Sequence, residues 1–116
     1  MFYTFNQNNT GGSFVDNDEV CHFVIVGADS AEQANRRAET FGLYFDGYGD
    51  CDCCGNRWYE QWADTDGTAE PQIYDKPPQE YQCMWTSEGE VYCRVYHLDG
   101  LKQEYRVFKP AVKKLK

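Results

Sequence analysis

The chain has 116 residues, 41% of them hydrophobic and 16% aromatic, and a formal net charge of −8, so we expect one domain with a modest, ring-rich core. Its acidity disfavours nucleic acid as a partner, because phosphate contacts need Lys and Arg, and favours a basic protein surface. It shows neither an apolar run of about 18 residues nor a signal-peptide pattern. We therefore expect no membrane contact and a cytosolic location, where cysteines stay reduced.

Residues 2–5 predict a short strand, and residues 6–13 predict a polar loop after it. This loop carries amides that could bind a ligand and glycines that let a backbone approach closely. These candidate ligand-binding residues are Asn6, Gln7, Asn8, Asn9, Gly11 and Gly12. A plain turn is the alternative for the same stretch.

Further strand signals follow at residues 14–15 and 20–26. The second run is apolar on both alternating faces, which is typical of a central strand. Cys21 and His22 lie near its start. The imidazole of His22 could bind a metal or simply face solvent.

The best-defined element is a helix that begins after Ser30. Ser30 and Gln33 have the spacing of a capping box, and Gly42 supplies a left-handed stop. Small residues recur at helical spacing on one face: Ala31, Ala34 and Ala38. Such a face lets the helix axis lie close to a sheet, and we expect the opposite face, which includes Asn35, to lie in solvent.

Three cysteines stand within four residues after the helix: Cys51, Cys53 and Cys54. Cys51 and Cys54 have the spacing of a zinc knuckle, with Gly55 after them. The remaining ligands would come from Cys53, from Cys21 or His22, or from Cys83 and Cys93. A structural zinc ion is therefore the candidate cofactor, with free buried thiols or disulfides as alternatives. Because no pattern places a base beside a cysteine nucleophile, we do not expect an enzyme.

The C-terminal part carries the clearest strand signal, after a short strand predicted at residues 58–62. Residues 81–86 and 90–96 predict a hairpin whose three-residue loop would set Cys83 opposite Cys93. Asp99 and Gly100 predict a two-residue type I′ turn into a last strand that ends near residue 108.

Together these elements predict an α+β domain over residues 1–109 with a basic tail over residues 110–116. We expect an antiparallel sheet of about five or six strands, with one helix packed on one face and a cysteine-rich loop.

Four segments carry a family resemblance: residues 6–14 (NQNNTGGSF), 29–35 (DSAEQAN), 43–47 (LYFDG) and 51–58 (CDCCGNRW). Over residues 1–62 the chain resembles an uncharacterised family of small bacteriophage proteins. The resemblance implies a phage product made in the cytoplasm of a host bacterium, and it implies no particular activity. It also makes the Asn-rich loop and residues 51–58 the places to look for a shared site.

These observations favour a non-catalytic phage accessory protein that binds and modulates or inhibits a host factor, with a defence system as the target. Aromatic side chains would supply contact area, although core packing is the alternative for each: Tyr44, Tyr48, Trp58 and Trp62. A second hypothesis is a sponge for a small nucleotide signal, held by residues 6–12, a stacking ring and Arg57. A third is a metal-stabilised structural or virion-associated protein.

Overall fold

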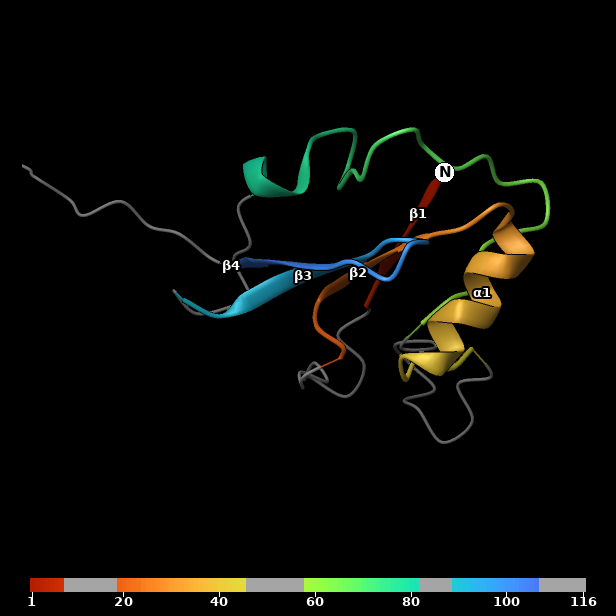
Figure 1. Cartoon of the computed structure of the whole chain (residues 1–116), viewed down its shortest axis with the longest axis horizontal. Coiled ribbons are helices and arrows are strands. Elements are labelled where there is room, and N and C mark those ends of the chain that lie inside the picture. Colours follow the sequence, from red (N-terminus) through yellow and green to blue (C-terminus); the bar gives the residue numbers. More distant parts are fainter. Residues whose placement is uncertain (8–18, 46–57, 82–88, 107–116) are drawn as a thin grey trace, which may run out of the picture.

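The computed structural model describes residues 1–7, 19–45, 58–81 and 89–106. In chain order its elements are β1 (Phe2–Asn6), β2 (Phe23–Gly27), α1 (Ala31–Thr40), the short 3-10 helix η2 (Pro78–Glu80), β3 (Val91–Tyr96) and β4 (Lys102–Arg106) (Figure 1). The fold is α+β, as predicted. Nothing in the described part is a helix of the length and apolarity that a membrane crossing requires.

The four described strands form one mixed sheet in the order β1-β2-β3-β4. The pairs β1–β2 and β3–β4 are antiparallel, whereas β2 and β3 run parallel. The prediction of an antiparallel sheet is therefore confirmed for two of the described strand pairs and wrong for β2–β3, and the described strands number four rather than five or six. A parallel pair needs a long crossover, and here that crossover carries α1 and the whole middle of the chain.

Some predicted strands have a different outcome. The stretch at residues 58–62 forms no strand and runs as irregular chain instead. Residues 14–15 and most of the predicted strand at 81–86 lie outside the described residues, as does the basic tail. The β3–β4 connection is a three-residue loop, because His97 N–H donates to Leu101 O at 2.8 Å and Gly100 N–H to His97 O at 3.1 Å. Only Gly100 has a positive φ there, at 98°, so the turn is not the predicted type I′.

The helix forms as its sequence predicts. Ser30 Oγ accepts a hydrogen bond from Gln33 N–H at 3.1 Å, which caps the first turn. Gly42 has φ 112°, and the N–H groups of Gly42 and Leu43 donate to Glu39 O and Ala38 O, both at 3.2 Å. This pattern is a Schellman motif, which satisfies the last carbonyls of the helix.

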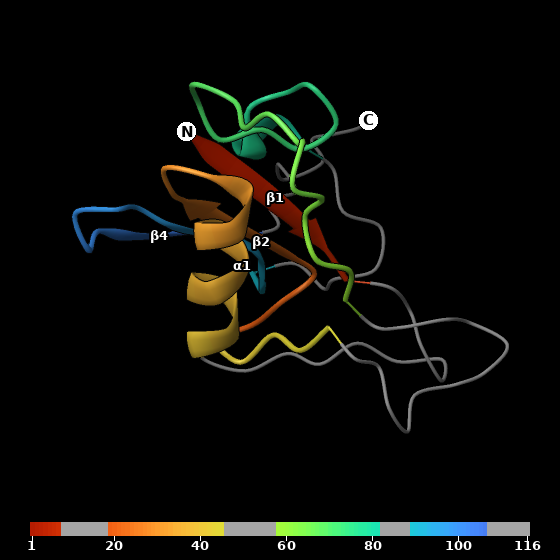
Figure 2. The ribbon, with the colours of Figure 1, turned by 90° about the vertical axis from the view of Figure 1, so that its right-hand side faces the viewer.

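One face of the sheet packs against a helix, and the other face packs against a segment of mostly irregular chain (Figures 1 and 2). On one face α1 buries its alanines against Val24 and Val26 of β2. On the other face Phe23 and Ile25 of β2 pack against Ile73, which belongs to the irregular segment 58–81. Strand β2 is buried on both faces, so its prediction as a central strand is confirmed.

Candidate functional site

The irregular segment 58–81 passes from α1 to the far face of the sheet along the outer edge of β1. Phe2 and Thr68 form an isolated β-bridge with N–H···O distances of 2.7 and 2.9 Å. Further on, Thr4 Oγ1 donates to Gln72 O at 2.7 Å. These bonds cover part of an edge strand that would otherwise expose its backbone groups.

On its other side the segment is bonded to the helix through Asn35. Asn35 Nδ2 donates to Gln61 O at 3.0 Å, and Gln61 N–H donates to Asn35 Oδ1 at 2.7 Å. Gln61 Nε2 in turn donates to Thr4 O of β1 at 2.8 Å. Asn35 is only 5% exposed, so the prediction that this position lies in solvent was wrong. Its partner is distant in sequence, and helical periodicity gives no sign of it.

One hollow, here called the aromatic groove, lies between α1 and residues 59–63. It has a volume of about 560 Å³ and is lined by Glu32, Asn35, Arg36, Phe45, Tyr59, Glu60, Gln61, Trp62 and Ala63. Trp62 is 78% exposed and Tyr59 is 55% exposed. Arg36 forms a 2.6 Å ion pair with Glu39, so Glu32 and Glu60 give the groove a negative rim.

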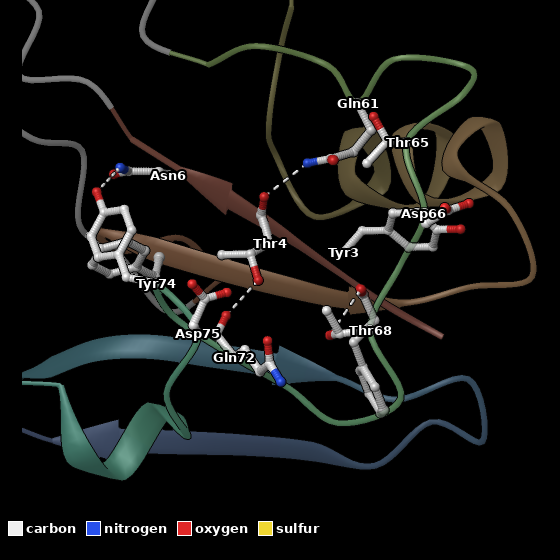
Figure 3. A pocket seen from close by; sticks show the side chains of 12 residues that line it. Tyr3, Thr4, Asn6, Gln61, Thr65, Asp66, Thr68, Gln72, Tyr74 and Asp75 are labelled. Carbon is white, nitrogen blue, oxygen red and sulfur yellow. Dashed lines mark hydrogen bonds between the residues drawn. The ribbon is translucent and has the colours of Figure 1, made fainter.

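The second hollow, here called the β1-edge cleft, has a volume of about 310 Å³ (Figure 3). Its described lining consists of Phe2, Tyr3, Thr4, Asn6, Phe23, Gln61, Thr65, Asp66, Thr68, Gln72, Tyr74 and Asp75. Gln61 lines both hollows. The lining therefore combines amides, hydroxyls and rings with two carboxylates.

The predicted ligand and contact residues fall into different environments. Asn6 is exposed and lines the β1-edge cleft, where its Nδ2 donates to the Tyr74 hydroxyl at 2.6 Å. Gln7 is buried, and its Nε2 donates to Cys21 O at 3.0 Å, so this amide supports the fold. Trp58 is a core residue at 1% exposure, and Tyr44 packs half-buried against the same core. The other predicted residues lie outside the described part of the chain: Asn8, Asn9, Gly11, Gly12, Tyr48 and Arg57.

The predicted metal ligands are described only in part, because Cys51, Cys53 and Cys54 lie outside the described residues. Cys21 and His22 are buried just before β2. Burial lowers the pKa of His22 to about 4, so its imidazole is neutral at pH 7, the form that binds metals. The described residues bring together no group of three side chains that could hold a metal ion. The zinc ion stays a prediction, which elemental analysis of the purified protein would test.

The predicted Cys83–Cys93 pair also falls partly outside the described residues, because Cys83 does. Cys93 is buried in β3, with Phe23 of β2 and Tyr105 of β4 as its strand neighbours. Burial raises the pKa of the Cys93 thiol well above its usual range, and the nearby Cys21 raises it further. At neutral pH this thiol is therefore protonated and chemically quiet.

The functionally suggestive residues that sequence reasoning missed are Tyr59, Asp66, Tyr74 and Asp75. All four belong to segment 58–81, where the one element predicted from the sequence, a strand at residues 58–62, does not form. A local signal near Asp66 is the turn composition of residues 65–68 (TDGT).

Comparison of the chain with curated proteins and with solved structures yields no match. A family model described as a domain of unknown function, DUF7296, matches residues 1–113. The chain therefore belongs to the DUF7296 family.

Proposed function

We propose that this protein is a non-catalytic bacteriophage accessory protein that binds a host protein with a basic surface and modulates or inhibits it. The aromatic groove is the contact surface in this proposal. The observation that carries it is the exposure of Trp62, at 78%, on a segment bonded to both α1 and β1.

A tryptophan this exposed is unusual in a folded domain, because burying its ring removes a large apolar area from water. Trp and Tyr are also the side chains that most often dominate binding energy at protein interfaces. Tyr59 stands three residues from Trp62 and is likewise mostly exposed. The two rings together offer a partner an apolar contact of the kind found at interface centres.

The rings are carried by a backbone that is held in place. Gln61, directly before Trp62, is bonded to Asn35 of α1 and to Thr4 of β1. A preorganised contact surface loses less conformational entropy on binding than a loose loop does. The groove is therefore better suited to specific binding than its lack of regular structure suggests.

Charge supports a basic partner. Glu32 and Glu60 line the groove, and Arg36, the one arginine among its described lining residues, is paired with Glu39. The chain as a whole carries a net charge of −8. Lys and Arg of a partner would meet a complementary potential, which speeds association and rejects acidic proteins.

The resemblance to small bacteriophage proteins supplies the setting, which is the cytoplasm of an infected bacterium. We infer that the target is a host defence protein. An accessory protein that acts by binding alone can inhibit such a target by covering the surface that the target uses for its own function.

The test is a titration of the purified host partner, obtained by affinity capture and identified by mass spectrometry. We expect Trp62→Ala to weaken binding by about 30-fold or more, the effect of a hot-spot residue. The matched control is Leu98→Ala, which trims a 48% exposed apolar side chain in the β3–β4 loop. Equal affinities for the two variants, or a partner with an acidic contact surface, would contradict the proposal.

The nucleotide sponge and the virion protein remain alternatives. The described charged residues of the β1-edge cleft are Asp66 and Asp75, which would repel a phosphate. The nucleotide hypothesis therefore ranks second, and a rise in melting temperature with a signalling nucleotide would favour it. Detection of the protein in purified phage particles would favour a virion role.

A further inference from the structure

The β1-edge cleft is a second candidate site, distinct from the aromatic groove apart from the shared Gln61. Its volume of about 310 Å³ lies at the lower end of the range for small-ligand pockets. In Figure 3 Asp66 and Asp75 appear on opposite sides of Thr4, and Tyr74 closes one end beside Asn6. The cleft can hold a small molecule or one long side chain.

A tight turn brings Tyr74 and Asp75 to this cleft. Ile73 and Lys76 exchange two backbone hydrogen bonds, of 2.8 and 3.1 Å, around them. Tyr74 and Asp75 both have positive φ, at 51° and 69°, which is the pattern of a type I′ turn. That turn favours Asn-Gly, and a bulky side chain at positive φ is a genuine outlier. A tyrosine therefore occupies a turn position that asparagine would adopt with less backbone strain.

The ring of Tyr74 is held in a defined position although the residue is exposed. Its hydroxyl accepts the hydrogen bond from Asn6, and its ring makes an edge contact with Phe23 at a centroid distance of 5.9 Å. The strained turn therefore places Tyr74 and Asp75, an aromatic ring and a carboxylate on consecutive residues, in the lining of the same cleft.

The electrostatics of the lining point to a cation. Asp66 and Asp75 are its charged members, and within the described residues neither carboxylate forms an ion pair. All other described lining residues are neutral. Carboxylates bind ammonium and guanidinium groups through charge-assisted hydrogen bonds, and aromatic faces attract the same groups. An anionic ligand would find no compensating charge here.

We propose that the β1-edge cleft binds one ammonium or guanidinium group, held by Asp75 and the ring of Tyr74, with Asp66 adding attraction across the cleft. The group could belong to a free small amine or to a Lys or Arg side chain of another protein, since the recognition chemistry is the same. This proposal does not depend on a partner at the aromatic groove.

The experiment is a titration of the labelled full chain followed by amide chemical shifts, with agmatine as the cationic probe. Butanol, which has the same four-carbon chain but no charge, serves as the neutral probe. We expect agmatine to shift residues that line the cleft, with an affinity that falls as salt is added, and butanol to leave them unshifted. Equal shifts with both probes, or shifts spread evenly over the chain, would overturn the proposal.

Two variants sharpen the result. Asp75→Asn removes the charge but keeps a side chain that tolerates positive φ, and we expect agmatine affinity to fall about tenfold. Asp64→Asn is the control, because Asp64 is exposed and outside the lining. An unchanged affinity in Asp75→Asn, or an equal loss in Asp64→Asn, would overturn the assignment.

A double change, Tyr74→Asn with Asp75→Gly, installs the preferred turn residues. We expect it to raise the melting temperature while agmatine binding is lost, since the strain is relieved and both recognition groups are removed. Retained binding in this folded variant would contradict the proposal.

A titration with a peptide that has one arginine between glycines identifies the source of the cationic group. If the peptide binds at least about tenfold more tightly than agmatine, the group is a protein side chain, and if it binds more weakly, the group is a free amine.

Discussion

The two faces of the sheet are built in different ways. On one face a capped helix lays small alanines against β2, and the signals that start and end this helix lie within residues 30–43. On the other face and along β1, the irregular segment 58–81 is positioned by bonds to distant residues such as Asn35 and Thr4. Both hollows border this segment. The helix face supplies stability from local signals, whereas the segment offers the surfaces that a ligand or partner could use.

The largest expected loss of stability is at Trp58, where segment 58–81 meets the helix face of the sheet. This residue begins the segment, yet its side chain is 1% exposed in the core under α1. We expect Trp58→Ala to lower the free energy of unfolding by about 3–5 kcal/mol, the usual cost of truncating a buried aromatic. Urea unfolding measures it. Trp62→Ala is the control and should change stability by less than about 0.5 kcal/mol, so similar losses in both variants would contradict the packing described.

A smaller loss is expected where the segment is bonded to the helix. Asn35→Ala removes both hydrogen bonds to the backbone of Gln61. We expect a loss of about 2 kcal/mol, since the unpaired backbone groups outweigh the gain in helix propensity. The same unfolding experiment on Arg36→Ala, an exposed neighbour in a surface ion pair, should show under about 0.5 kcal/mol. An Asn35→Ala variant as stable as Arg36→Ala would mean that the amide does not hold the segment.

A pH-dependent loss is expected at the start of β2. Burial holds the pKa of His22 at about 4, below its ordinary value of 6.5, so the unfolded chain takes up the proton first. The contribution of neutral His22 is complete above about pH 6.5 and is lost as the pH falls toward 4. Unfolding curves between pH 7.5 and pH 4.5, recorded with EDTA, should show a steeper decline for the natural chain than for His22→Gln. Parallel declines would place His22 in solvent.

The smallest effect tests the local signals of the helix face. Ser30→Ala removes the cap that accepts from Gln33 N–H, and we expect a loss of about 1 kcal/mol. Because no residue of segment 58–81 contacts this cap among the described hydrogen bonds, agmatine binding should stay unchanged. Ser30→Asp, which keeps an acceptor, should restore stability, and its failure to do so would contradict the capping role.

The comparison also explains what the sequence could and could not predict. The helix cap, the Gly42 stop and the apolar character of both faces of β2 are local patterns, and the structure confirms each. The parallel pairing of β2 and β3 has no signature within either strand, because the two strands are distant in sequence and joined by the long crossover that carries α1. The burial of Asn35 and the position of the Tyr74 ring depend on contacts far along the chain. For that reason the sequence predicted the helix well and missed most residues around the two hollows.

The most direct measurement of the central claim is site-specific photo-crosslinking in the host bacterium. Benzoylphenylalanine replaces Trp62 in the aromatic groove or, as the control, Leu98 in the β3–β4 loop. We expect position 62 to yield a covalent adduct with one protein that has a basic surface, and position 98 to yield none. The same adducts at both positions, or none at position 62, would contradict the account that segment 58–81 is the binding surface of this protein.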